Sequence, residues 1–216
     1  TLAVGAEAYR QFKNPDQALF MSISATQHIV KSFVNRAKNV NCKEIIGVDT
    51  SNPTEIMAFM LKSLPAGFTN TVCMNLAEKW APEAIQAAKE GLSDIKENTE
   101  SCLSCASEVV KNMGGNDQEA AIVSGLAGGI GLSGNGCGAL AAAVWMNTLK
   151  QSEFNNEEQA QYGSNNSKIL EAFKKVTDSE ILCSKISGQE FKTVEEHTEF
   201  IRSGGCQKII EVLSQA

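Results

Sequence analysis

The stretch Gly125–Trp145, GLAGGIGLSGNGCGALAAAVW, decides the fold of this chain. It contains no charged residue, it is dense in glycine, and it places Cys137 just before an alanine-rich segment. Glycine is favoured where the backbone turns tightly or comes close to another group. We therefore expect a tight loop that presents Cys137, followed by a closely packed helix over residues 139–145. At the start of that helix, the helix dipole is expected to lower the pKa of Cys137.

The composition around this stretch favours an all-α protein. The 216 residues include few aromatic residues and only four prolines, which suits closely packed helices. The net charge is −6 and there is no basic run, which excludes the usual nucleic-acid binders and disfavours an anionic membrane surface. Residues 120–149 carry no charge, but their central glycines, Ser133 and Asn135 predict two short helices and a loop, not a membrane span.

The hydrophobic periodicity predicts helices along most of the chain. The predicted helical segments are 2–12, 17–37, from Pro53, 73–80, a further turn over 82–88, 100–113, 118–127, 139–145, 168–176, from Thr193, and 207–214. Cys102 and Cys105 would lie one turn apart on the 100–113 helix. Residues 151–166 are hydrophilic and are expected to form a polar linker, and the polar stretch 91–98 is expected to divide the chain into two halves.

The two halves resemble each other in sequence. CKEIIG at 42–47 matches CSKISG at 183–188, and Cys73 matches Cys206 with similar downstream residues. We therefore expect a helical bundle of two related halves, residues 1–92 and 98–216, packed about a pseudo-two-fold axis. The first-half counterpart of Cys137 would fall just before residue 1, so the first half is expected to be a degenerate or front-truncated repeat. Cys42 and Cys73 are then candidates for a second site if a preceding segment supplies two more cysteines; otherwise they would be free thiols, a disulfide or relics.

The second half resembles a family of redox-active proteins named for its C_GCAxxG_C_C pattern. The matching residues are Cys105 in SCASEVV, Cys137 to Ala139 after GGIGLSGNG, Cys183 in ILCSKISG and Cys206 in GGCQKIIEVL. Ala142 departs from the pattern, since the family has a glycine there. The resemblance implies a helical module with four functional cysteines. A related domain accompanies an iron–sulfur cluster in split-Soret-type cytochromes.

The cysteines allow several kinds of chemistry. Thiolate ligands from Cys105, Cys137, Cys183 and Cys206 could hold an iron–sulfur cluster for electron transfer, with Cys102 as a substitute or extra ligand. Gly136 and Gly138 would then let backbone N–H groups approach the cluster sulfurs. Thiol–disulfide exchange is the alternative, because Cys102 and Cys105 form a CxxC. Four-cysteine zinc binding and a structural or partner-binding module with inert cysteines also remain open.

Other motifs are weaker. Residues 129–134 spell GxGxxG, but an alanine-rich helix is expected before them instead of a strand, so no nucleotide is predicted. There is no CxxCH for haem, and His28 and His197 are expected to be surface or boundary residues.

The expected partner is a redox protein, and a homo-oligomer is a further expectation. No enzymatic reaction is predicted. No secretory signal is visible and the chain begins without Met, so we expect a soluble protein that is cytoplasmic or exported with its leader removed.

Overall fold

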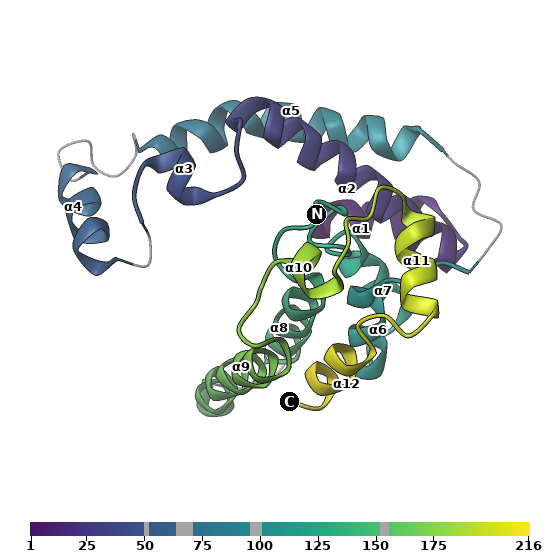
Figure 1. Cartoon of the computed structure of the whole chain (residues 1–216). Coiled ribbons are helices and arrows are strands. Elements are labelled where there is room, and N and C mark those ends of the chain that lie inside the picture. The colour runs from purple at the N-terminus through teal and green to yellow at the C-terminus, as the bar shows by residue number, and fades with distance from the viewer. Residues whose placement is uncertain (50–51, 64–70, 96–100, 152–155) are drawn as a thin grey trace.

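A computed structural model of the chain describes residues 1–49, 52–63, 71–95, 101–151 and 156–216. These residues form helices joined by loops (Figure 1). Within the described ranges there is no strand, only an isolated antiparallel bridge between Gly136 and Leu182. The prediction of an all-α protein is therefore confirmed. No helix in this part of the chain is both long and apolar enough to cross a membrane.

The helices follow one another along the whole chain. In order they are α1 (Leu2–Gln11), α2 (Pro15–Ala37), α3 (Cys42–Ile46), α4 (Pro53–Ser63), α5 (Val72–Ser93), α6 (Cys105–Asn112), α7 (Asp117–Ser124), α8 (Gly138–Gln151), α9 (Asn156–Thr177), α10 (Cys183–Ser187), α11 (Val194–Arg202) and α12 (Gln207–Gln215).

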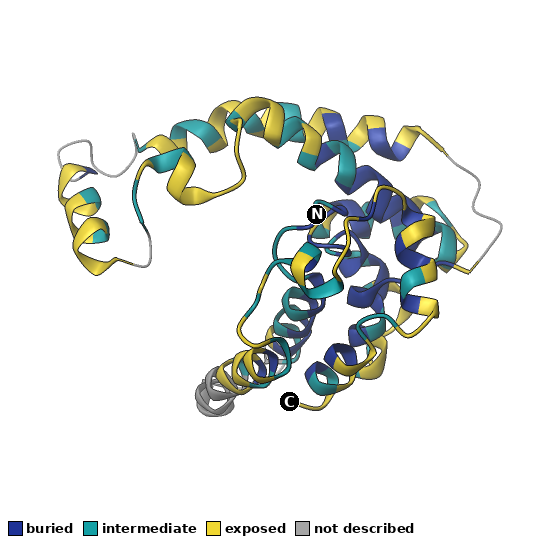
Figure 2. Ribbon diagram, in the orientation of Figure 1, coloured by how far each residue is buried: buried dark blue, intermediate teal, exposed yellow. Residues whose placement is uncertain are grey.

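The hydrophobic core lies where the second half meets α1 and the first half of α2. Every residue from Ala18 to Thr26 is buried, so this part of α2 is covered on all sides. Helix α7 packs against α1, α2 and α6, while α8 packs against α6 and α9, and α12 packs against α6, α8 and α9. Figure 2 shows the buried residues concentrated in this region. Because one hydrophobic cluster contains residues of both halves, the halves are not separate bodies. The boundaries 1–92 and 98–216 and the pseudo-two-fold axis remain predictions.

An arm of two long helices leaves this core. Helices α2 and α5 run side by side, and α3 and α4 lie at the far end of the pair (Figure 1). The two helices approach closely at Gly91, where an added Cβ would lie 2.6 Å from the Cα of Ala25. Only the last part of α5 is buried, and α3 has no buried residue. The arm, defined here as residues 30–49, 52–63 and 71–86, is therefore mostly exposed (Figure 2).

Two predicted interruptions of helices are wrong. Residues 72–93 form one helix with Pro82 inside it, although proline was expected to separate two segments. Proline removes one hydrogen bond from a helix interior, and here the packing of α5 on α2 outweighs that loss. The expected polar linker 151–166 is also wrong, since α9 already begins at Asn156. Ile169 and Phe173 in the same helix are fully buried and anchor it, so its hydrophilic first part needs no apolar face of its own.

Candidate functional site

The four cysteines of the motif each lie at the start of a helix. Cys105 and Cys183 are the first residues of α6 and α10, and Cys137 and Cys206 immediately precede α8 and α12. Backbone N–H groups in the first turn of a helix lack partners within the helix and are free to bind other groups. The four cysteines come from segments far apart in sequence, and the fold places each of them at a helix start with such N–H groups.

Local hydrogen bonds join the start of α10 to the loop that precedes Cys137. The N–H of Cys183 donates to the carbonyl of Asn135 at 2.8 Å, and the N–H of Ser184 donates to the carbonyl of Gly134 at 3.0 Å.

The glycine-rich loop needs glycine at particular positions. At Gly138 an added Cβ would lie 1.9 Å from the carbonyl oxygen of Leu126. Gly129 has a φ of +80°, and its Cβ would lie 2.9 Å from the Cβ of Cys183. At Gly136 an added Cβ would meet nothing within 4 Å. The close approach expected of this loop is therefore found at Gly138 and Gly129, but not at Gly136.

The four thiols lie together. Cys105 interacts electrostatically with the other three cysteines, Cys183 and Cys206 each interact with Cys137, and Cys206 interacts with Cys183. All six pairs within the set are therefore coupled. Cys105 and Cys183 are buried and Cys137 and Cys206 are half-buried.

Burial decides the protonation of these thiols. It raises the pKa of Cys183 to about 11 and that of Cys206 to about 12, and it raises the pKa of Cys105 well above its usual range. The neighbouring thiols add to each of these increases. The lowered pKa expected for Cys137 is wrong: burial raises it, although the N–H groups of Leu140 and Ala139 act in the opposite direction. Without a cation, all four are neutral thiols.

The thiols are coupled, but they are not spaced as ligands of one metal ion. Among the described residues, no group of three or more His, Cys, Asp or Glu side chains is arranged to hold a metal. The donor set fits a thiolate-bound metal in number and kind.

Cys102 lies apart from this set. It precedes α6 and is not on the helix that was predicted to carry it, and its Sγ lies 3.8 Å from Oγ1 of Thr198. Burial raises the pKa of Cys102 to about 12, and its other electrostatic neighbours are Asp16, Glu195 and Lys111. Cys102 is thus not among the thiols that the structure brings together.

His197 was expected to be a surface or boundary residue, but it is only 1% exposed. Its ring packs edge-on against Phe191, with 4.9 Å between the ring centroids, and its Nδ1 has no hydrogen-bond partner among the described residues. An added Cβ at Gly128 would lie 3.5 Å from its Cδ2, and the N–H of Gly128 donates to the thiol of Cys105. His197 thus supports the glycine-rich loop beside the site. A signal for this burial was available in the sequence. In α11, His197 lies three residues after Val194 and four residues before Ile201, so the three side chains share one face of the helix. His28 is half-buried on α2, as expected for a boundary residue.

The remaining candidates, Cys42 and Cys73, lie on the arm. Both are exposed. The described structure thus places them outside the four-cysteine set.

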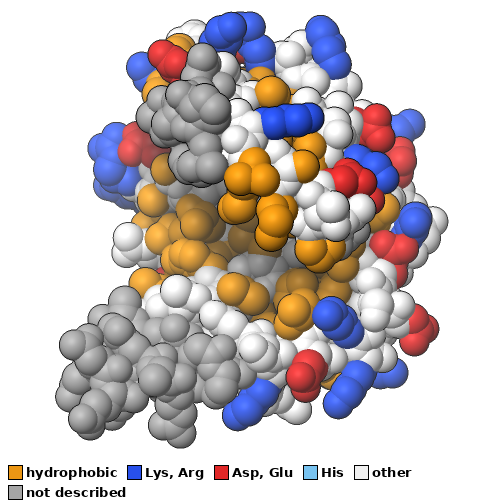
Figure 3. Space-filling model, turned by 90° about the vertical axis from the view of Figure 1, so that its left-hand side faces the viewer, with side chains coloured by type: hydrophobic (Ala, Val, Ile, Leu, Met, Phe, Trp, Pro, Cys, Tyr) orange, Lys and Arg blue, Asp and Glu red, His pale blue; other side chains and the backbone are white. Residues whose placement is uncertain are grey.

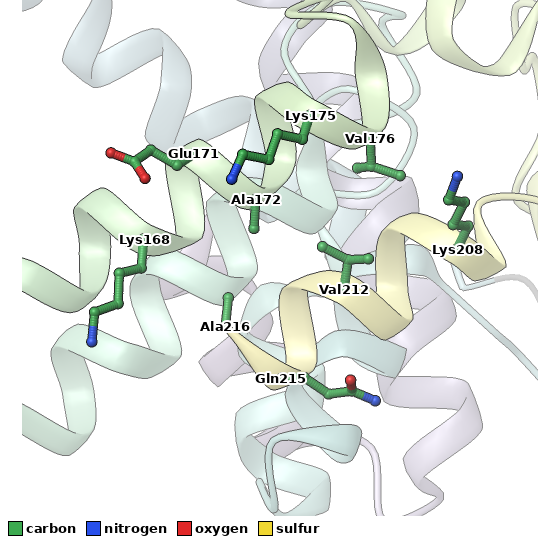
Figure 4. Close-up of a pocket in the computed structure, with 9 residues that line it drawn as sticks. All are labelled: Lys168, Glu171, Ala172, Lys175, Val176, Lys208, Val212, Gln215 and Ala216. Carbon is green, nitrogen blue, oxygen red and sulfur yellow. The ribbon is translucent and has the colours of Figure 1, made fainter.

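A surface pocket of about 450 Å³ reaches Cys206 between the end of α9 and the start of α12, and its lining includes Lys185 and Lys208. A larger groove of about 920 Å³ between α9 and α12 adjoins it, since Val176 and Lys208 line both. Figure 4 shows the residues of this groove, among them Lys175 and Glu171. Cys206 therefore lines a surface opening.

Comparison with known proteins identifies the family of the second half. A family model described as "Putative redox-active protein (C_GCAxxG_C_C)" matches residues 99–215, more than half of the chain. No curated protein and no solved structure matches the chain. The chain belongs to the C_GCAxxG_C_C family, and the resemblance found in the sequence is confirmed.

Proposed function

We propose that this member of the C_GCAxxG_C_C family binds an iron–sulfur cluster through Cys105, Cys137, Cys183 and Cys206 and transfers electrons through it. One observation carries the proposal: four thiols from four helix starts are mutually coupled in a largely buried place. Iron–sulfur clusters in proteins are most often held by four cysteine thiolates, and a bound cluster accepts and releases single electrons.

The chain supplies an environment suited to such a group. Burial shields Cys105 and Cys183 from water, and the raised pKa values keep all four thiols neutral until a cation displaces their protons. The N–H groups of Gly128, Ala139 and Leu140 already point at the sulfur atoms of Cys105 and Cys137. Hydrogen bonds of this kind stabilise negative charge on sulfur and raise a cluster's reduction potential.

Thiol–disulfide exchange has less support. The attacking group in that chemistry is a thiolate, and buried thiols with raised pKa values react slowly. The CxxC that suggested it is also divided, because Cys105 belongs to the set and Cys102 faces Thr198. Zinc binding uses the same ligands and is separated from the cluster by the experiment below.

The opening at Cys206 is the natural place for a redox partner. Lys175, Lys185 and Lys208 lie along the pocket and the adjoining groove. Carboxylates of Glu171, Asp178 and Glu180 line the same openings, and Lys185 pairs with Glu180, so a partner that brings its own redox group close to Cys206 would meet charges of both signs.

The test is anaerobic reconstitution with iron and sulfide of the whole chain and of two serine variants. Cys137→Ser removes a proposed ligand, and we expect it to lose at least half of the bound iron and its visible absorbance. Cys102→Ser is the matched control, since it removes a buried thiol outside the set and should keep both. If the protein takes up zinc but neither iron nor sulfide, the four cysteines form a zinc site and not a cluster site. Equal iron in the two variants would refute the ligand set.

A further inference from the structure

The groups that hold the glycine-rich loop in place are buried, unlike the hydrophobic side chains that gather around a hollow at the surface in Figure 3. One of them is His197 in the middle of α11, and the carbonyl of Leu103 accepts a hydrogen bond from its ring. Because Nδ1 has no hydrogen-bond partner among the described residues, the donor is Nε2. The ring is thereby tied to the segment that leads into α6.

The same ring contacts the turn that donates to the thiol of Cys105. Its Cδ2 lies 3.5 Å from the place that a Cβ of Gly128 would take, which is an ordinary van der Waals distance. The N–H of Gly128 donates to the thiol of Cys105, and Leu103 lies two residues before that cysteine. His197 thus contacts both the segment that leads into Cys105 and the residue that donates to its sulfur.

The turn that begins at Gly128 has an unusual backbone. Five consecutive residues, 128–132, have φ angles between +57° and +80°. Glycine adopts this left-handed conformation readily, but other residues adopt it at a cost and as single residues, not in runs. Ile130 and Leu132 both carry side chains, so the surrounding structure must hold the turn in this form.

Contacts from two helices hold it. Helix α2 packs on the turn at Gly131, where an added Cβ would lie 2.9 Å from the carbonyl carbon of Thr26. Helix α11 packs on it at Gly128 through His197, whose own ring is held edge-on by Phe191. The direction of the N–H of Gly128 therefore depends on where the imidazole lies.

We propose that His197 is a positioning residue that fixes Cys105 and the N–H donor of its sulfur, and that it thereby sets the reduction potential of the group bound at the four cysteines. This role rests on the proposed function. An N–H that donates to a ligand sulfur stabilises the reduced state, which carries more negative charge, and so raises the potential. The imidazole acts through its position and not through a charge, because burial lowers its pKa to about 4 and leaves it neutral at pH 7.

The test compares His197→Leu with His197→Gln in the whole chain. Leucine fills much of the space but has no donor, whereas glutamine places an amide N–H near the position of Nε2. After anaerobic reconstitution with iron and sulfide, a spectroelectrochemical titration measures the reduction potential. We expect His197→Leu to bind as much iron as the wild type and to shift the equilibrium about tenfold toward the oxidised form, which is about 59 mV for one electron. His197→Gln should restore more than half of this shift.

Amide hydrogen exchange of the chain without iron tests the positioning independently of the bound group. The N–H of Gly128 should exchange at least tenfold faster in His197→Leu than in the wild type, and His197→Gln should stay within threefold. A wild type that takes up neither iron nor sulfide would refute the proposed function and the effect on the potential. The exchange rates would still decide whether His197 holds the turn.

Thr198→Val is the matched control, because the hydroxyl of Thr198 donates to the same carbonyl of Leu103 at 3.2 Å. It should leave the potential and the exchange of Gly128 within twofold of the wild type. If His197→Leu does not fold, His197→Asn replaces it, since that side chain ends near the place of Nδ1. A folded Leu or Asn variant with the potential and exchange rate of the wild type would overturn the proposal. So would loss of the iron from that variant, or an equal shift in Thr198→Val.

Discussion

At the scale of the residue, Cys137 shows two opposing effects on one thiol. Its place before α8 gives it N–H donors from Ala139 and Leu140, which favour the thiolate. Burial favours the neutral thiol, and this effect is larger. The sequence indicates the helix start but not the depth of burial, which depends on segments distant in the chain. A reactive thiolate was therefore the wrong expectation, while the helix start itself was predicted correctly.

Gly138 gives the sharpest prediction about packing. Gly138→Ala would place a methyl group 1.9 Å from the carbonyl oxygen of Leu126, a backbone atom that can move away only with its loop. We expect a loss of about 3 kcal/mol in the free energy of unfolding, as for other overpacked sites. Urea denaturation followed by circular dichroism measures it. Gly136→Ala is the control, with open space around the new methyl group and an expected change within about 0.5 kcal/mol. Similar losses in both variants would contradict the packing described here.

His197 predicts a dependence of stability on pH. Burial lowers the pKa of His197 to about 4, from an ordinary value of 6.5. Between these values the unfolded chain binds a proton that the folded chain does not, so stability falls as the pH is lowered from about 6.5 to 4. The full difference amounts to roughly 3 kcal/mol. Denaturation at a series of pH values should show a shallower slope for His197→Gln than for the wild type, whatever the variant's stability at pH 7. Parallel slopes would place His197 in contact with water.

At the scale of the element, the starts of the helices carry both the fold and the site. The hydroxyl of Ser104 accepts from the N–H of Ser107 at 3.0 Å, and Ser107 returns a bond to the N–H of Ser104. Both residues are completely buried, and this capping box holds the start of α6, where Cys105 lies.

Ser104→Ala leaves the N–H of Ser107 without its partner in a buried place. Leaving a buried donor unsatisfied costs about 1–3 kcal/mol, and we expect a loss of about 2 kcal/mol in the free energy of unfolding. Thr71→Ala removes an equivalent cap from α5 on the exposed arm, where water can replace the bond to Met74, so its cost should stay below 1 kcal/mol. Thermal unfolding of the two variants compares them directly. A smaller loss at Ser104 than at Thr71 would show that the start of α6 is held by other contacts.

Most helices could be predicted from local patterns, because their caps and apolar spacing lie within a few residues. Thr193 caps α11 as the sequence indicated, whereas α2 is capped by Asn14 and not by Asp16, the cap that the sequence suggested. The errors arose where distant packing overrides local preference. Pro82 lies within a helix that is supported by α2, and the hydrophilic start of α9 continues into a buried segment.

At the scale of the whole molecule, the site depends on contacts that no local pattern contains. The sequence predicted which four cysteines belong together, on number and family resemblance. It could not predict that Cys102 lies outside this set of four. Its thiol contacts Thr198 of α11, which is distant in sequence and also forms a hydrogen bond with the 101–104 segment. Nor could it show that Cys206 reaches a surface pocket, since α9 and α12 form that opening together.

The central claim is that the four thiols hold a group that accepts electrons. The most direct measurement is the visible absorption spectrum of the anaerobically purified whole chain, before and after reduction with dithionite, with iron and acid-labile sulfide determined on the same sample. We expect broad visible absorbance that bleaches on reduction, and iron and sulfide in equal amounts. A colourless protein that contains neither iron nor sulfide, and gains neither on anaerobic reconstitution, would contradict the claim.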